Sequence, residues 1–267
     1  MESVEMVLFQ LLCFVLMPMA YHGLFKRNRE AVRPAILIFF ASWIGEASAV
    51  YFYGFYHYSE LWWFRIAGVP LLIPLIWPMV ILSGREVLRA LWPAGIKHEA
   101  WALALLVFID ASLIEVVSVR CGLWSWVEPG YLGVPLIGVA GWAWFALAVM
   151  LILRRTSGRR QWWVVPGAPI ILHLLLVASW WIFLKWHWRG DWFWQFAVII
   201  AILAWAALRL RRQRRMSMDV VRIRLLAAGI FGLLLLFTAP LAGRVWLHVL
   251  MVSVPYTLLT RFGGPAK

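Results

Sequence analysis

Charged residues are scarce in this sequence, and their scarcity excludes a soluble globular protein. Only 14% of the 267 residues are Asp, Glu, Lys or Arg, whereas soluble domains carry about 25%. Hydrophobic residues make up 64% of the chain. Apolar stretches close to the roughly 20 residues that a helix needs to cross a bilayer recur along it. The composition therefore predicts a polytopic integral membrane protein.

Cysteine is rare, and the common metal and nucleotide motifs are absent. The two cysteines, Cys13 and Cys121, lie far apart and form neither a CxxC pair nor a disulfide framework. There is no HxxxH spacing, no DDxxD-type run, no P-loop, no GxGxxG and no nucleophile elbow. We therefore expect no metal and no cofactor.

Nine hydrophobic segments are predicted to cross the membrane as helices, because a spanning backbone must satisfy its own hydrogen bonds. The predicted spans are 5–24, 34–53, 67–83, 99–118, 134–153, 163–184, 192–208, 225–241 and 245–260. Only a Gly-Arg pair separates the last two, so eight spans are the alternative. The predicted fold is an all-α transmembrane bundle of eight or nine helices, forming a single membrane domain over residues 1–267.

The net charge of +13 is distributed in a way that predicts topology. The loops after the first, third, fifth and seventh spans carry eighteen Lys and Arg, and the loops between them carry five. The positive-inside rule then places the N-terminus outside, in a protein of the bacterial inner membrane. We expect the basic clusters to contact anionic lipid headgroups rather than nucleic acid.

Two blocks of sequence recur in the same order and indicate an internal repeat. Residues 54–60 (GFYHYSE) and 122–128 (GLWSWVE) share the pattern Gly-x-aromatic-x-aromatic-x-Glu. Residues 68–77 (GVPLLIPLIW) and 133–142 (GVPLIGVAGW) share Gly-Val-Pro-Leu, then Trp after five residues. The repeat units are about 34–83 and 99–153, and the predicted helices 6–9 follow at about 163–260. Both units start inside, go out and return, so the repeat is parallel.

Three acidic residues, Glu46, Asp110 and Glu115, fall inside predicted spans. A charged side chain at this depth is unfavourable by roughly 2.5–3.5 kcal/mol, so such residues often mark a function. At about 1.5 Å per residue, Glu46 and Asp110 both lie about 17 Å from the inner boundary. Trp77 and Trp142 fall in the same slab, so the four repeat helices are expected to bring these side chains together.

A purely structural role is the alternative for each acid. A neutral Glu46 could join helices through Ser42 or Tyr53, which lie on its own helix face. Glu115 has serines three residues away on either side. Asp110 has no polar neighbour at the third or fourth position along its helix, so it needs a partner from another helix, or water.

Three blocks carry a resemblance to a known family: GEASAVYFYGFYHYS, GVPLLIPLIWPM and DASLIEVVSVRCGLWSWVEPGYLGVPLIGVAGW. Over about residues 40–150 the chain resembles the membrane carotenoid hydratases, which act on γ-carotene or bisanhydrobacterioruberin. These enzymes are also grouped as carotenoid biosynthesis integral membrane proteins. The family's second block carries an Asn at the position where this chain has Gly138.

The resemblance implies addition of water to the terminal double bond of an acyclic carotenoid, through a tertiary carbocation and without a cofactor. It suggests Asp110 as the acid and Glu46 as the base that holds the water, with the exchanged roles as the alternative and Glu115 as a further catalytic candidate. Indole and phenol rings could stabilise the cation. The candidate substrate-binding residues are Tyr53, Tyr56, Trp77, Trp124 and Trp142.

Other functions compete with hydration. A terpenoid cyclase or isomerase would use the same proton donor but exclude water. A small-molecule transporter is suggested by the parallel repeat and the buried acids alone. A scaffold subunit would need neither acid. The expected partners are a lipophilic polyene or isoprenoid and the lipid bilayer, and the oligomeric state is left open.

Overall fold

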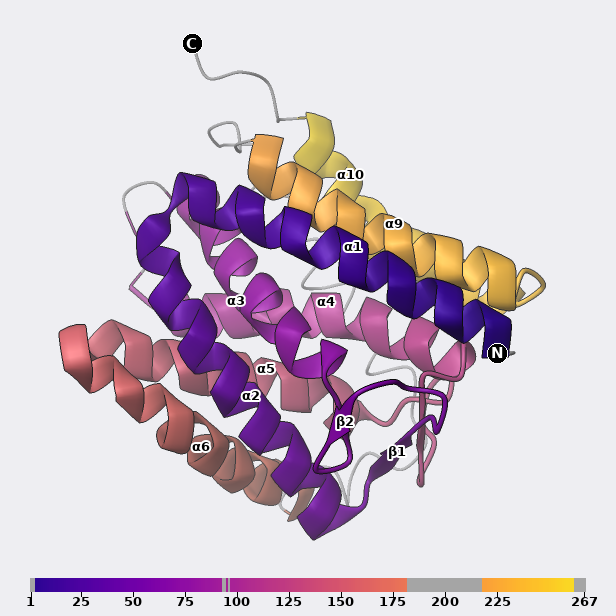
Figure 1. The fold of residues 1–267 in the computed structure, drawn as a ribbon, viewed down its shortest axis with the longest axis horizontal. Helices are drawn as coiled ribbons and strands as arrows, with labels where there is room; N and C mark the ends of the chain where they lie inside the picture. The colour runs from indigo at the N-terminus through magenta and orange to yellow at the C-terminus, as the bar shows by residue number, and fades with distance from the viewer. Residues whose placement is uncertain (1–2, 93–94, 96, 182–217, 262–267) are drawn as a thin grey trace.

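The computed structural model describes residues 3–92, 95, 97–181 and 218–261, and this part of the chain is almost entirely helical (Figure 1). Its α-helices are α1 (Ser3–Arg27), α2 (Val32–Tyr53), α3 (Leu72–Leu91), α4 (Glu99–Arg120), α5 (Leu136–Arg155), α6 (Val164–Ser179), α9 (Met218–Thr238) and α10 (Gly243–Arg261). Short 3-10 helices, Arg29–Ala31 and Gly158–Trp163, lead into α2 and α6. The predicted all-α polytopic bundle is confirmed. The helix expected at 192–208 lies outside the described residues.

Six helical segments in the described part of the chain are long and apolar enough to cross a membrane. They are 4–26, 29–53, 99–120, 136–155, 158–179 and 220–238. The helices α3 and α10 are not among these six, although both lie where spans are predicted. The chain is thus an integral membrane protein.

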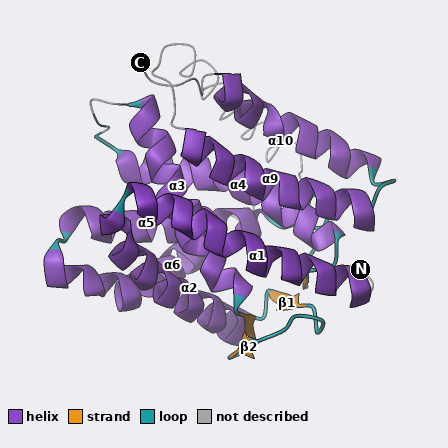
Figure 2. Cartoon of the chain, turned by 45° about the horizontal axis from the view of Figure 1, so that its top comes forward, coloured by secondary structure: helices purple, strands orange, loops and turns teal. Residues whose placement is uncertain are grey.

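Helices α2 to α5, which contain the sequence repeat, form the centre of the bundle. Consecutive helices in this group pack on one another, and α4 against α5 is the most extensive helix pair. On one side α6 packs on both α2 and α5, and on the other α1, α9 and α10 cover α3 and α4 (Figures 1 and 2). The central helices are therefore shielded from both sides, which suits buried polar side chains.

The third helix begins later than predicted, at Leu72 rather than residue 67. Residues 65–70 instead form a tight hairpin, in which β2 (Arg65–Ile66) pairs antiparallel with β3 (Val69–Pro70). The two turn residues, Ala67 and Gly68, have φ values of 52° and 79°. Positive φ at both central positions is the requirement of a type I′ turn, so this hairpin closes in two residues and delays the helix.

A second strand pair joins the two halves of the repeat. Strand β1 (Tyr56–Tyr58) pairs antiparallel with β4 (Trp124–Trp126), with Tyr56 opposite Trp126 and Tyr58 opposite Trp124. Each strand is the middle of one Gly-x-aromatic-x-aromatic-x-Glu motif. Gly54 (φ 57°), which ends α2, lets the chain turn sharply into β1. The recurrent motif therefore builds one small two-stranded structure across the ends of the central helices.

Candidate active site

Glu46 on α2 accepts hydrogen bonds from three aromatic side chains. The Tyr58 hydroxyl donates to Oε2 at 2.9 Å, and the Tyr56 hydroxyl makes a short hydrogen bond to the same oxygen. The Trp77 indole N–H donates to Oε1 at 3.0 Å. Burial, and after it the charge of Glu46, raises the pKa of Tyr56 and of Tyr58 well above its usual value. Both phenols therefore stay protonated and serve as donors.

Glu115 on α4 has an equivalent set of donors, and here all three are indoles. Trp124 and Trp126 donate their N–H groups to Oε2 at 2.9 and 3.0 Å, and Trp142 donates to Oε1 at 2.7 Å. The Glu115 side chain is 3% exposed, whereas Glu46 is half-buried. Three donors around each carboxyl offset much of the free-energy cost of placing a polar group at this depth.

The donors of the two glutamates occupy matching positions of the repeat. In each unit, two come from the aromatic positions of the strand motif, and the third is the Trp that follows Gly-Val-Pro-Leu after five residues. The two third donors, Trp77 and Trp142, lie against each other with ring centroids 4.4 Å apart. Across the strand pair, the Tyr56 and Trp126 rings are 4.9 Å apart. The two carboxyl cages, each a glutamate with its three donors, thus share their aromatic walls.

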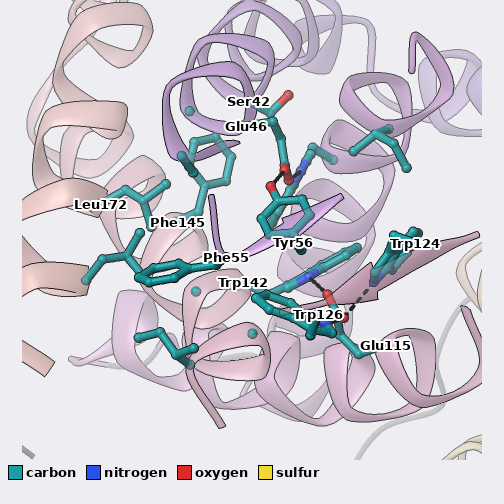
Figure 3. Close-up of a pocket in the computed structure, with 18 of the residues that line it drawn as sticks. Ser42, Glu46, Phe55, Tyr56, Glu115, Trp124, Trp126, Trp142, Phe145 and Leu172 are labelled. Atoms are coloured by element: carbon teal, nitrogen blue, oxygen red, sulfur yellow. Dashed lines mark hydrogen bonds between the residues drawn. The ribbon is translucent and has the colours of Figure 1, made fainter. Parts of the chain in front are cut away.

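Both glutamates line one cavity of about 70 Å³ at the centre of the bundle (Figure 3). Since a water molecule takes about 30 Å³ in the liquid, this space holds roughly two waters. Its lining includes the strand and helix aromatics of both cages, Phe55 and Phe145, the small residues Ser42, Gly45, Gly138 and Gly141, and Leu172 and Leu176 of α6. A polar pair of carboxyls therefore faces a small apolar and aromatic chamber.

Gly138 is required by the ring of Trp126. A Cβ at this position would lie 2.5 Å from Cζ2 of Trp126, which is closer than real contacts allow. In the other repeat unit the equivalent position is Ile73, and Tyr58 stands at the position equivalent to Trp126; both line the same cavity. The larger ring of Trp126 is thus paired with the missing side chain of Gly138, and the smaller ring of Tyr58 with the larger side chain of Ile73. The Asn of the hydratase pattern would not fit here with Trp126 in its present position.

Asp110 does not lie at this cavity, in contrast to the expectation from its depth. It lines a separate cavity between α3, α4, α1 and α9, and it forms a short, buried ion pair with Arg224 of α9. Asp110 and Glu115 are five residues apart on α4, so their side chains leave the helix about 140° apart. Asp110 and Glu46 were predicted to lie at the same depth in the membrane, but the Asp110 side chain leaves α4 in a direction that takes it away from Glu46.

Of the predicted substrate-binding residues, four line the central cavity: Tyr56, Trp77, Trp124 and Trp142. Tyr53 is not among the lining residues. Its hydroxyl lies 2.9 Å from Nδ1 of His173 on α6, and Ser48 Oγ lies 2.7 Å from Nε2 of the same ring. Tyr53 reaches the cavity only indirectly, by stacking on Phe55 with ring centroids 5.0 Å apart.

Two cage residues, Tyr58 and Trp126, were missed as candidates although the sequence carries a signal for them. They are the second aromatic positions of the recurrent motif, and on a strand they point to the same face as the first. Arg224 was also missed, and no local pattern could have found it, because it lies more than a hundred residues from Asp110. The glutamates that end the two motifs, Glu60 and Glu128, are exposed at the surface. The Arg65 guanidinium lowers the pKa of Glu60.

Within the described residues no group of three or more His, Cys, Asp or Glu side chains is placed to hold a metal ion. What the site offers is hydrogen-bond donors, carboxyl groups and aromatic ring faces. The fold and the site together define a polytopic helical membrane protein with two caged carboxyls at a central aromatic cavity.

The chain belongs to the carotenoid biosynthesis protein family, whose pattern matches residues 4–188. This range contains α1 to α6 and both carboxyl cages, while α9 and α10 lie beyond it. No curated protein and no solved structure matches the chain. Membership of the family indicates a role in carotenoid biosynthesis and a lipophilic isoprenoid substrate.

Proposed function

We propose that this protein is a carotenoid hydratase, which adds water to the terminal carbon–carbon double bond of an acyclic carotenoid by acid catalysis. The observation that carries the proposal is the pair of glutamates, Glu46 and Glu115, facing one aromatic cavity with room for water. Membership of the carotenoid biosynthesis family supports the substrate class. Hydration needs a proton donor, a bound water and a group that takes the water's proton.

The donors around each carboxyl suggest which one delivers the proton. An indole N–H donates a hydrogen bond but cannot accept one. A proton on Glu115 therefore finds no acceptor among Trp124, Trp126 and Trp142. Oε2 already accepts two N–H groups, so the proton belongs on Oε1 and is free to point into the cavity. These contacts favour Glu115 as the acid.

Glu46 is suited to the opposite role. Two of its donors, Tyr56 and Tyr58, are phenols, which can both donate and accept hydrogen bonds. They can reorient as the carboxyl gains or loses a proton. Glu46 is also the more exposed of the two glutamates, so water reaches it more easily. In this assignment Glu46 keeps the role expected from the sequence, and Glu115 replaces Asp110, which contacts a different cavity.

The proposed reaction conserves atoms and charge. The π electrons of the terminal double bond take the proton of Glu115 and form a C–H bond, which leaves a cation on the carbon that carries two methyl groups. The oxygen of the bound water then forms the C–O bond, and Glu46 takes the proton that this water releases. Between turnovers one proton returns from Glu46 to Glu115 through water in the cavity they share.

The aromatic walls are placed to assist the cationic step. A cation over the face of Trp or Tyr gains about 2 kcal/mol or more when water is excluded. Trp77 packs on Trp142 and Tyr56 on Trp126, so each pair joins a donor of one carboxyl to a donor of the other, and all four rings line the cavity. The anion left on Glu115 keeps its three indole donors, so charge of both signs is stabilised during the reaction.

The substrate must widen the cavity to enter it. A cavity of about 150 Å³ binds benzene, whereas the space between the carboxyls is only about 70 Å³. Leu172 and Leu176 of α6 contribute the wall that faces away from α3 and α4. They lie over Gly45 and Gly141, where an added Cβ would meet them at 3.4 and 3.6 Å. We propose that the polyene end enters from the lipid by displacing these two leucines.

The proposal is tested by expressing the protein in a bacterium that makes an acyclic carotenoid and analysing the pigments by mass. The unaltered protein should yield pigments heavier by one water molecule. Glu115→Gln should abolish this product at matched protein levels. The matched control is Glu128→Gln, a motif glutamate at the surface, which should leave the product unchanged.

Two results would contradict the proposal. Full hydration by Glu115→Gln would remove Glu115 as the acid. A pigment of unchanged mass but altered ring or double-bond structure would instead assign a cyclase or isomerase, which starts from the same cation and excludes water.

A further inference from the structure

A second cavity, of about 130 Å³, lies on the far side of α3 and α4 from the carboxyl cages. Four helices line it: α1 with Cys13 and Met17, α3 with Met79 and Ser83, α4 with Asp110 and Ile114, and α9 with Arg224 and Phe231. Asp110 and Ile114 leave α4 about 140° and 100° away from Glu115, so the two cavities lie on different faces of this helix. This second cavity is almost entirely apolar except at the wall made by Asp110, Arg224 and Ser83.

Arg224 is built into this wall, and one of its three guanidinium nitrogens, Nε, has no hydrogen-bond partner among the described residues. It is 6% exposed and pairs with Asp110, which is 4% exposed. Its Nη2 lies 3.4 Å from the Val80 carbonyl oxygen. Gly84 makes room for it, since a Cβ there would lie 2.9 Å from Nη2. A buried donor without a hydrogen bond lowers stability by about 1–3 kcal/mol, and by more when the group is charged.

We propose that this second cavity binds a neutral, membrane-soluble molecule whose apolar end carries one hydroxyl or carbonyl oxygen, which accepts the hydrogen bond of Arg224 Nε. Neutrality follows from the ion pair: Asp110 already balances Arg224, so a carboxylate or phosphate would add an uncompensated buried charge. The apolar lining favours a hydrocarbon body. Water alone is a poor occupant, since an ordered water needs two to four polar partners and the polar groups lie on one wall.

The volume sets the size of the group that enters. A cavity of about 150 Å³ holds benzene, so one of about 130 Å³ takes roughly six heavy atoms. A five-carbon isoprene unit with one oxygen has this size. The inference does not depend on the proposed hydration, because the second cavity shares neither Glu46 nor Glu115 with the first.

Cys13 provides a built-in reporter, because it lines the second cavity and the other cysteine, Cys121, does not. In a Cys121→Ser protein, the rate at which methyl methanethiosulfonate modifies Cys13 is measured by intact mass. The probes are 3-methylbut-2-en-1-ol and its hydrocarbon counterpart 2-methylbut-2-ene. Both should slow the reaction, and the alcohol should do so at about tenfold lower concentration, as expected for a hydrogen bond to a charged donor.

Three variants separate recognition from simple filling. The double variant Asp110→Leu/Arg224→Met removes both members of the ion pair, a change that proteins often tolerate. It should abolish the tenfold preference for the alcohol, while the hydrocarbon still protects Cys13 from modification. Ala228→Leu fills the cavity from α9 and should abolish protection by both probes. Gly229→Leu adds comparable bulk where a Cβ meets nothing within 4 Å, and it should behave as the unaltered protein.

The outcomes that overturn the proposal are distinct. Equal protection by alcohol and hydrocarbon means that Arg224 recognises no oxygen. Absence of protection by either probe means that the cavity holds only water or side chains. If the double variant still prefers the alcohol to the hydrocarbon, a donor other than Arg224 makes the hydrogen bond. If Cys13 proves unreactive, the same comparisons are made by the rise in Tm that each probe produces in the purified protein, with the same outcomes deciding.

Discussion

The two carboxyl cages have the same geometry but different proton chemistry. Glu46 and Glu115 each accept hydrogen bonds from two strand aromatics and one helix tryptophan. The donors to Glu46 are two phenols and one indole, whereas the donors to Glu115 are three indoles. A duplicated framework can therefore place two carboxyls symmetrically and still give them different roles, because the identity of the donors decides where a proton can go.

The largest contrast expected concerns the orientation of this framework in the membrane. A parallel repeat whose N-terminus is outside puts both motif ends at the outer face. In a cysteine-free background, Glu60→Cys and Glu128→Cys should both react with a membrane-impermeant maleimide added to intact cells, whereas Arg155→Cys should react only after permeabilisation. If only one of the two motif cysteines is labelled, the two repeat units do not have the same orientation. If only Arg155→Cys is labelled in intact cells, the topology is the reverse of the predicted one.

The next largest effect should come from removing each acid in turn. A general acid contributes about 10²- to 10⁴-fold, so Glu115→Gln should lose at least a hundredfold in hydration. Glu46→Gln should still form the cation but capture water poorly, so part of the product should become a double-bond isomer of unchanged mass. Pigment mass and absorption spectra measure both effects. Identical products from the two variants would mean that the cages do not differ in role.

The phenols around Glu46 should matter more for turnover than for stability. Tyr56→Phe keeps the ring and removes one hydrogen bond to a carboxyl, and it should slow hydration about tenfold. Trp124→Phe, the equivalent change in the other cage, should mainly lower Tm, because Trp124 is 6% exposed and its loss leaves a void. Hydration rate and Tm are measured for both variants. A larger loss of rate in Trp124→Phe than in Tyr56→Phe would contradict this difference between the phenols and the indoles.

A smaller effect is expected where the two cages differ in packing. Gly138→Asn should lower stability by about 1–3 kcal/mol, because the new side chain collides with Trp126. Adding Trp126→Phe should recover part of that loss, since the two positions are in contact. The control is Gly141→Ala, where a Cβ meets Leu176 at an ordinary 3.6 Å. Unfolding of the purified variants checks this, and additive losses would show that Trp126 is not the obstacle.

The smallest effect should come from the wall formed by α6. Leu172→Ala removes part of the barrier between the cavity and the lipid, and it should raise the rate of hydration a few-fold if entry of the polyene limits turnover. Leu174→Ala is the matched control, because Leu174 is 65% exposed on the same helix and does not line the cavity. Equal rates for both variants would place the entry elsewhere.

The sequence by itself determined the membrane class, the helical fold and part of each cage. Apolar runs and the need to satisfy backbone hydrogen bonds in lipid lead directly to helices. Depth along the predicted helices, together with the family resemblance, pointed to Tyr56, Trp77, Trp124 and Trp142, which all line one cavity. These features are local or periodic, so they can be read along the chain.

Tertiary structure alone decided which acids meet. Counting residues from the membrane boundary gave the depth of Glu46 and Asp110 but not their direction, and five residues along α4 turn Asp110 away from Glu115 and toward Arg224. The antiparallel pairing of β1 with β4, which brings Tyr56 beside Trp126, likewise links segments about seventy residues apart. Depth is set by position along one helix, whereas direction and partners are set by how all the helices pack, and no local pattern encodes that.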